Sequence, residues 1–240
     1  MLIVNADDLG RNSVATDRIL QCHSEGRVTC ASAMVFMEDS ERAASLAKTN
    51  QLEVGLHINF TESFTGSSVP ASLRSAHERI RKFLRRSKYA PVLYNPFLRR
   101  AFRDVFEQQM QEFARLYGRT ASRFDGHQHM HLASNMVIDH PIPAGAKVRR
   151  SFSFSAGERN VVNRLYRAAV DRRLAARYRI GDFFFAFSKH LPLARLCRVI
   201  ELARTHEVEL MTHPELDTEF NSLLSPEFAQ VSAPAQFAKA

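Results

Sequence analysis

The sequence lacks several features that would assign it to a common class of protein. Its 240 residues include only three cysteines, which form no dense disulfide framework and leave one unpaired, so we expect a reducing compartment. The apolar start, Met1–Val4, meets Asn5 and Asp7 too soon to be a signal peptide. No run approaches the roughly 18 apolar residues of a membrane span. We therefore expect a cytoplasmic protein without a transmembrane segment.

Three kinds of motif are missing as well. No Gly-x-Ser-x-Gly elbow supports a serine nucleophile, and no glycine-rich loop is available to cradle a phosphate. No zinc finger or aromatic RNP stretch indicates a nucleic-acid module. No internal repeat or domain boundary stands out either. With 45% hydrophobic residues, the chain is expected to form a single domain over residues 1–240 with a full core.

The formal net charge of +8 is concentrated in two basic segments, residues 79–103 and 164–179. Such segments can hold nucleic acid, anionic lipid or a phosphorylated substrate. They are also typical of solvated helix faces, which is the interpretation we favour because no nucleic-acid signature accompanies them. No nucleic-acid partner is expected, and assembly as a homo-oligomer is left open.

Short apolar runs alternate with amphipathic segments along the chain. Strands are predicted over residues 2–4, 28–35, 53–59, 123–127, 147–150 and 208–212, and helices over 14–25, 40–50, the middle of 61–96, 97–117, 158–179 and 191–206. This alternation favours parallel strands with helical crossovers, and the length fits an α/β barrel. The pattern fades after about residue 217, so the tail is expected to be partly disordered.

Three of the ten histidines lie within residues 124–131, just after an aspartate. In extended backbone, Asp125, His127, His129 and His131 would begin on one face. That arrangement would gather imidazole nitrogens beside a carboxylate, as a divalent metal site requires. The alternatives are an exposed polar loop, or one core histidine flanked by two solvated ones. A metal site is favoured because histidine is the commonest metal-ligating side chain.

The other polar candidates fall where predicted strands end. Asp7 and Asp8 close the first strand, and His57 lies near the end of its own. His127 follows the next strand, and His213 terminates the last. Singly, the two acids could be a helix cap or turn pair, and each histidine could be a satisfied core residue. In a barrel of parallel strands, however, such side chains converge on one mouth.

These residues suit the metal-assisted hydrolysis of an amide. Asp8, His57 and His127 would leave coordination positions open for water and substrate, as in catalytic metal sites. Asp7, adjacent in sequence but facing elsewhere, could accept the proton of the water. His213, across the mouth, could protonate a departing amine.

Taken in order, five motifs resemble those of the YdjC-type carbohydrate deacetylases, which include the chitooligosaccharide deacetylases. They are residues 5–10, 26–29, 54–57, 125–131 and 212–214, and the resemblance extends from residue 1 to about 215. It implies an irregular (β/α) barrel of the polysaccharide-deacetylase kind and a role in carbohydrate metabolism. It also implies one divalent metal ion, magnesium or zinc, and removal of acetyl groups from N-acetylated sugars or oligosaccharides.

The resemblance also implies roles for individual residues. Carried over by motif, the metal ligands are Asp8, His57 and His127, the general base is Asp7, and the acid is His213. Residues expected to contact the substrate or support the ligands are Asp125, His129, His131 and Arg149. The chain departs from the family pattern at Leu9 and at Ala133–Ser134, where a different local loop is expected. Residues 67–100 and the tail after Phe228 also match the pattern poorly, and these two segments would shape the sugar pocket and any oligomer contact.

Two other functions are consistent with these residues. A metal-dependent phosphoesterase would use clustered histidines and acids to hold two ions, with the basic segments binding the phosphate. A non-catalytic barrel that binds an anionic ligand or nucleic acid would show strongly salt-dependent binding and release no acetate. Metal stoichiometry distinguishes the first of these from a deacetylase, which needs one ion.

Overall fold

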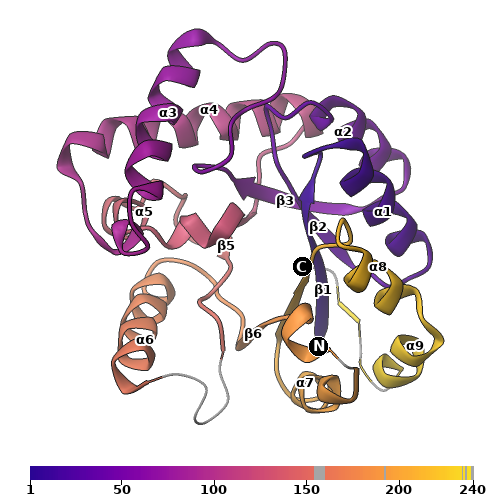
Figure 1. Ribbon diagram of the computed structural model, residues 1–240. Coiled ribbons are helices and arrows are strands. Elements are labelled where there is room, and N and C mark those ends of the chain that lie inside the picture. The colour runs from indigo at the N-terminus through magenta and orange to yellow at the C-terminus, as the bar shows by residue number, and fades with distance from the viewer. Residues whose placement is uncertain (154–159, 192, 234, 236, 239–240) are drawn as a thin grey trace.

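The computed structural model describes residues 1–153, 160–191, 193–233, 235 and 237–238, and its centre is a parallel sheet of seven strands. The strands, in chain order, are β1 (Leu2–Leu9), β2 (Cys30–Ala33), β3 (Glu53–Ile58), β4 (Arg123–Gly126), β5 (Lys147–Val148), β6 (Phe183–Ala186) and β7 (Val208–Thr212). Their order across the sheet is β5-β4-β3-β2-β1-β7-β6. The sheet curls with helices packed around it (Figure 1), which confirms the predicted α/β fold of the irregular-barrel kind.

The edge strands of the sheet are β5 and β6, and the chain that follows β5 reaches across to β6. Ser153 donates its backbone N–H to Phe184 O at 2.9 Å, and Phe184 N–H donates to Ser153 Oγ at 3.1 Å. This segment links the side of β5 to β6 and makes the barrel irregular. Because every ladder is parallel, the carboxyl ends of all the strands lie at the same end of the barrel.

Nine α-helices are described around the sheet. They are α1 (Ser13–Ser24), α2 (Ser40–Thr49), α3 (Ala71–Arg85), α4 (Arg99–Tyr117), α5 (Ser134–Asp139), α6 (Val161–Ala175), α7 (Leu196–Ala203), α8 (Asp217–Leu224) and α9 (Pro226–Ser232). Asn12 caps α1 by accepting a hydrogen bond from Ala15 N–H at 2.8 Å, and Gly118, with φ 69°, ends α4. None of these helices is long and apolar enough to cross a lipid bilayer.

Several predicted boundaries need correction. The strand predicted over 147–150 pairs only at Lys147–Val148, and β6 was not predicted. The helix predicted from residue 97 begins at Arg99, so Phe97 lies in a preceding 3₁₀ turn and is 88% exposed instead of joining the core stripe. Residues 158–159 of another predicted helix lie outside the described residues.

The segment after residue 217, expected to be partly disordered, forms α8 and α9 over residues 217–232. Both helices are short, so their hydrophobic periodicity is weak. They are held by a few well-buried side chains: Leu223 and Phe228 are fully buried. Phe187, which directly follows β6, packs edge-on against Phe228 with ring centroids 5.7 Å apart.

Candidate metal centre

A change of backbone conformation at the end of β1 brings two adjacent carboxylates into one site. Neighbouring residues of a strand normally face opposite sides of the sheet. Asp8, however, has φ 69°, and the pairing of β1 with β2 shifts register between Ala6 and Leu9. His57 Nε2 therefore lies 3.2 Å from Asp8 Oδ1 and 4.0 Å from Asp7 Oδ2. Asp7 faces the same imidazole as Asp8, contrary to the expectation that it points elsewhere.

Asp8, His57 and His127 meet at the carboxyl ends of β1, β3 and β4. His127 Nδ1 lies 2.9 Å from Asp8 Oδ1, and one ligand atom from each of the three residues lies within 4.8 Å of the other two. All three side chains are buried. Two imidazole nitrogens and one carboxylate oxygen form a donor set that suits a divalent metal ion.

His57 is oriented by Asp125, the residue beside it on β4. Its Nδ1 lies 2.7 Å from Asp125 Oδ1, which leaves Nε2 directed at Asp8. The second oxygen of Asp125 accepts a 2.5 Å hydrogen bond from Ser32 and lies 2.8 Å from Arg149 Nη2. A carboxylate behind a metal-ligating histidine fixes the ring and makes it a stronger ligand. In this site both oxygens of Asp125 have partners: Oδ1 faces His57, and Oδ2 faces Ser32 and Arg149.

The far nitrogen of His127 has a different partner. Its Nε2 lies 3.0 Å from Glu62 Oε2, while Glu62 Oε1 accepts a 2.9 Å hydrogen bond from Arg11. Burial alone would raise the pKa of Glu62, but the hydrogen bonds from His127 and Arg11 lower it overall. Glu62 was not singled out in the sequence. Its position, in the loop that follows β3 at the mouth, is the signal that could have identified it.

The pKa of His57 reflects an excess of negative charge. Burial alone would lower it, but the charges of Asp7 and Asp125 raise it to about 10. The largely buried charges around the site are the carboxylates of Asp7, Asp8, Asp125 and Glu209 and the guanidiniums of Arg123 and Arg149. With neutral imidazoles, four carboxylates and two guanidiniums leave two uncompensated negative charges. A divalent cation fits this set in charge as well as in donor type.

Asp7 is held as a carboxylate by Arg149, which follows β5. Arg149 donates from Nη1 to Asp7 Oδ2 at 2.8 Å and from Nη2 to Asp7 Oδ1 at 2.7 Å, and Asn5 Nδ2 donates to Oδ1 at 2.6 Å. Burial by itself would raise the pKa of Asp7, but the charge of Arg149 lowers it overall. Asp7 is therefore ionised and fixed beside the three-residue cluster.

His129 and His131 do not continue the face on which Asp125 and His127 lie, so that expectation is wrong. The strand ends at Gly126, and the chain enters a turn in which Gln128 and His129 have φ 52° and 61°. His131 is buried, with Nε2 3.0 Å from Arg149 O. His129 points away to Phe152, with ring centroids 4.5 Å apart. Burial lowers the pKa of His131 to about 4 and that of His129 to about 3.

His213 directly follows β7 at the same end of the barrel. Thr212 pairs with Ala6, so the next residues, His213 and Asp7, are level at the mouth. Glu219 of α8 fixes this corner by accepting hydrogen bonds from Thr212 Oγ1 and from the His213 backbone N–H, each at 2.7 Å. Among the described residues, His213 belongs to neither group that could hold a metal ion.

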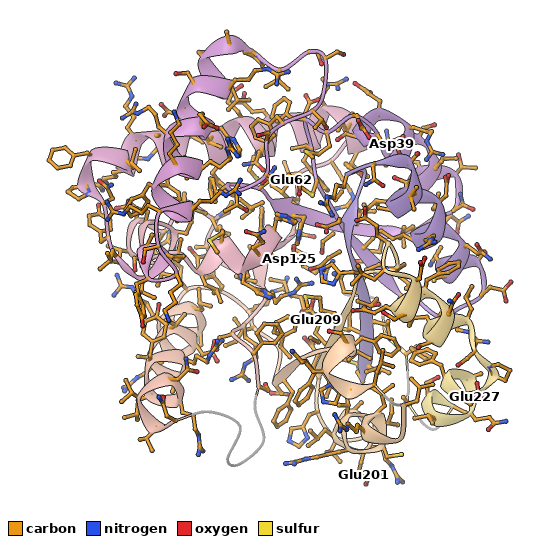
Figure 2. All side chains as sticks on the ribbon, viewed as in Figure 1. Asp39, Glu62, Asp125, Glu201, Glu209 and Glu227 are labelled. Carbon is orange, nitrogen blue, oxygen red and sulfur yellow. The ribbon has the colours of Figure 1, made fainter. Side chains whose placement is uncertain are left out.

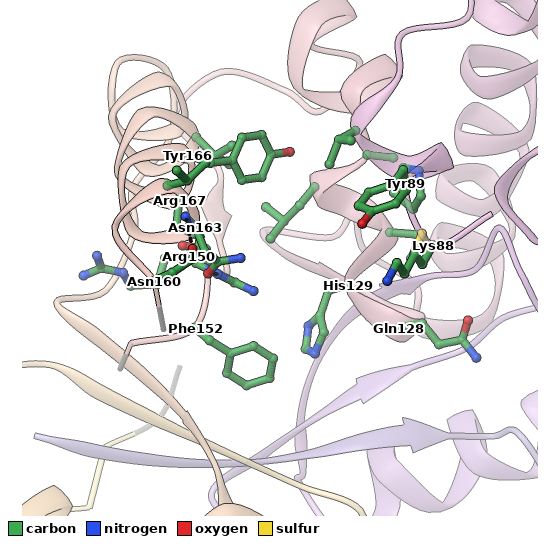
Figure 3. A pocket seen from close by; sticks show the side chains of 18 residues that line it. Lys88, Tyr89, Gln128, His129, Arg150, Phe152, Asn160, Asn163, Tyr166 and Arg167 are labelled. Atoms are coloured by element: carbon green, nitrogen blue, oxygen red, sulfur yellow. Dashed lines mark hydrogen bonds between the residues drawn. The ribbon is translucent and has the colours of Figure 1, made fainter. Parts of the chain in front are cut away.

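Two hollows open beside the cluster and share Gln128. One, of about 570 Å³, is lined by His127, Glu62 and Arg11. The larger, of about 790 Å³, lies between α6 and residues 88–92, with Tyr89 and Tyr166 on opposite walls (Figure 3). His129 and Phe152 lie at the end nearer the sheet. The smaller hollow is lined by His127 itself, and the larger one by the next two residues, Gln128 and His129.

Comparison with known proteins identifies relatives. A family profile described as "YdjC-like protein" matches residues 1–234. The chain is 27% identical over 226 residues to a chitooligosaccharide deacetylase from Serratia marcescens, which covers 89% of this chain and 81% of that protein. It is 28% identical over 222 residues to a carbohydrate deacetylase from Brevibacillus brevis, covering 89% and 80%.

Other similarities are shorter or concern the fold alone. A chitooligosaccharide deacetylase from Proteus mirabilis is 32% identical over 133 residues, which is 55% of this chain and about half (50%) of that protein. The crystal structure of a candidate cellobiose-phosphate cleavage protein from Enterococcus faecalis superposes with a TM-score of 0.68 at 16% identity. That match covers 99% of this chain and 96% of the other, so the two share a fold.

Proposed function

The chain belongs to the YdjC-like protein family, as its motifs predicted, and we propose that it is a metal-dependent hydrolase that removes the acetyl group from an N-acetylated sugar or oligosaccharide. Relatives named carbohydrate or chitooligosaccharide deacetylase support this proposal. The observation that carries it is the meeting of Asp8, His57 and His127 beside an ionised Asp7. We further propose that the whole chain forms one catalytic domain.

Asp8, His57 and His127 would hold one divalent ion, zinc or magnesium. When bound, such an ion lowers the pKa of a water molecule and polarises an acyl oxygen. The residues behind the ligands keep them in place: Asp125 holds His57 through Nδ1, and Glu62 holds His127 through Nε2.

Asp7 is proposed as the general base. It lies within 4.0 Å of the imidazole of His57, and Arg149 keeps its carboxylate ionised and in one orientation. Because Asp7 is already deprotonated, it is ready to accept a proton from water. His213, level with Asp7 at the mouth, is proposed to protonate the departing sugar amine.

The substrate is proposed to occupy the hollows beside the cluster. Planar aromatic side chains of Tyr89, Phe152 and Tyr166 offer stacking surfaces in the larger one, and His129 lies at its inner end. The acetyl group would enter past Gln128, which lines both hollows.

A two-metal phosphoesterase is disfavoured by the place of Arg149. A second group that could hold an ion consists of Asp7, His57 and Asp125. Arg149 Nη2 already lies 2.7 Å from Asp7 Oδ1 and 2.8 Å from Asp125 Oδ2, so its positive charge occupies the position between these carboxylates. We therefore propose a single ion.

The proposal is tested by measuring acetate release from N-acetylated mono- and oligosaccharides, with the enzyme loaded with zinc or magnesium and with chelator added. A deacetylase releases acetate from at least one sugar, and chelator abolishes the release. Activity that survives complete metal removal would refute the metal dependence. Failure to release acetate from any of these sugars, combined with two tightly held ions per chain, would favour the phosphoesterase.

A further inference from the structure

Glu209 is the second residue of β7, next to the guanidinium that holds Asp7. Arg149 donates from Nε to Glu209 Oε1 at 2.7 Å, and the Glu209 side chain is only 13% exposed. Figure 2 labels Glu209 and Asp125 in the middle of the molecule. Asp7 and Asp125 already offset the single positive charge of Arg149, so charge neutralisation alone does not account for a third carboxylate beside it.

The two Nη atoms of Arg149 contact two other carboxylates, those of Asp7 and Asp125. Asp7 binds both Nη atoms, at 2.7 and 2.8 Å, while Asp125 Oδ2 approaches Nη2 at 2.8 Å. One nitrogen is therefore shared between two acceptors. A small rotation of the guanidinium within its own plane would favour Asp125 at the expense of the paired hydrogen bonds to Asp7.

Two contacts restrict the movement of this guanidinium. Phe184 of β6 packs on its face, with Cζ 4.9 Å from the ring centroid, and this contact limits tilting out of the plane. It does not limit rotation within the plane. The hydrogen bond from Nε to Glu209 limits this in-plane rotation, because it fixes the third nitrogen of a planar group whose other two nitrogens donate to Asp7.

A second arginine also lies near Glu209, but at a longer distance. Arg123 Nη1 is 3.7 Å from Glu209 Oε1. Arg123 Nη2 has other acceptors, namely Ala31 O and Ser32 Oγ at 3.0 Å each and the side-chain oxygen of Asn5. Arg149 Nε donates to Glu209, so loss of Glu209 affects mainly Arg149.

We propose that Glu209 is a positioning residue for the hydrolysis: it sets the in-plane orientation of Arg149, so that both Nη atoms hold Asp7 where it accepts the proton. This inference rests on the proposed function in that Asp7 is the proposed base. Glu209 acts through Arg149 and contacts none of Asp8, His57 and His127 in the described hydrogen bonds and ion pairs, so its loss should not change metal content.

The test compares Glu209→Ala and Glu209→Gln in the metal-loaded full chain. Glu209→Ala removes the acceptor, and we expect kcat for acetate release to fall about 10- to 100-fold, the scale of a misplaced catalytic group. KM is expected to change less than about threefold, because bound substrate is not contacted. Glu209→Gln retains an oxygen that accepts from Nε, so we expect kcat within about fivefold of the unmodified enzyme.

Glu207→Ala is the matched control. Glu207 directly precedes β7, and its carboxylate lies 3.0 Å from Lys147 Nζ, so this variant also loses a carboxylate and an ion pair, two residues away from Glu209. It leaves Arg149 untouched, and kcat should stay unchanged. A Glu209→Ala enzyme as fast as this control would overturn the proposal. So would a Glu209→Gln enzyme as slow as Glu209→Ala, because charge rather than orientation would then matter.

A crystal structure of Glu209→Ala separates this inference from the proposed function. If the unmodified enzyme releases no acetate, the proposed function fails, but the placement of Arg149 can still be examined. Arg149 rotated toward Asp125, with one of its hydrogen bonds to Asp7 lost, supports the role of Glu209. Arg149 still bound to both oxygens of Asp7 overturns it, whatever the activity.

Discussion

The two histidines of the candidate metal centre are supported in different ways. His57 is 1% exposed and is backed by Asp125, which is also 1% exposed and is held in turn by Ser32 and Arg149. His127 is 10% exposed and is backed by Glu62, which is 27% exposed and shared with Arg11. One side of the site is therefore enclosed by protein, and the other is open to solvent.

This difference in burial indicates that the two histidines have different roles. A buried charged network has few alternative arrangements, because an unpaired charge in the interior is costly. An exposed carboxylate can exchange a protein partner for water at little cost. We infer that the His57 side determines where the ion sits and the His127 side adjusts when substrate enters through the adjoining hollows.

The largest effect is expected from Asp7→Asn, on the enclosed side. Asn keeps the shape but cannot act as a base, so kcat should fall about 10²- to 10⁴-fold. Metal content, measured by elemental analysis, should remain at one ion per chain because Asp7 is not a proposed ligand.

His127→Ala is the comparison variant for that experiment. It should lose the ion as well as activity, because it removes one of three ligands. If Asp7→Asn lost metal to the same degree as His127→Ala, the assignment of Asp7 as base would be wrong.

Asp125→Asn should weaken metal binding about 10- to 100-fold, the usual cost of removing the carboxylate behind a ligating histidine. It also removes one of the acidic partners of Arg149, so the free energy of unfolding should fall too. Calorimetric titration of the metal-free protein with zinc measures the affinity, and urea unfolding measures the stability. An unchanged zinc affinity would show that Asp125 does not orient His57.

Glu62→Gln should have a smaller effect, less than about tenfold in metal affinity, because its carboxylate is partly exposed. If the open side adjusts to substrate, KM should rise more than the dissociation constant for zinc. Steady-state kinetics at saturating zinc provides the measurement. A loss of zinc affinity as large as that of Asp125→Asn would abolish the distinction between the two sides.

The smallest effect on the metal site is expected at His77 of α3, a buried histidine that packs on an apolar neighbour and belongs to neither group of possible ligands among the described residues. It is 3% exposed and packs on Phe64 with ring centroids 4.2 Å apart, and burial lowers its pKa to about 4. Since the unfolded chain binds this proton near pH 6.5, stability from His77 is present above that pH. It is lost as the pH falls from about 6.5 toward 4.

His77→Leu should remove this dependence, which is on the order of 2 kcal/mol across that window. Urea unfolding at pH 7 and pH 4.5 checks it, with the difference between the two pH values compared in mutant and unmodified protein. Equal pH dependence in both would show that His77 is not the titrating group. Both histidines are buried, but the pKa of His57 is raised and that of His77 is lowered, because only His57 has Asp7 and Asp125 beside it.

Much of this architecture was predictable because the signals are local. Alternating apolar runs predicted the parallel barrel, and the polar residues at strand ends predicted that Asp8, His57 and His127 would be neighbours. The turn at His129 was not predictable, because it depends on two residues with left-handed backbone. If the strand had continued beyond Gly126, its alternation would have placed His129 and His131 on the same face as His127.

The supporting acids could not be predicted for a different reason. Glu62 lies in a loop and Glu209 near the start of a strand, and neither is close in sequence to the residue that it supports. Their partners are 65 residues away for Glu62 and His127 and 60 residues away for Glu209 and Arg149. The curvature of the sheet brings Arg149, which follows the edge strand β5, to Glu209 on β7, whereas Glu62 and His127 follow the neighbouring strands β3 and β4. No short-range pattern in the sequence records either contact.

Anomalous diffraction from crystals soaked in zinc tests the central claim most directly. The account predicts one strong peak at the carboxyl end of the barrel, within about 2.3 Å of a nitrogen of His57, a nitrogen of His127 and an oxygen of Asp8. A peak elsewhere on the protein, with none among these three side chains, would contradict it.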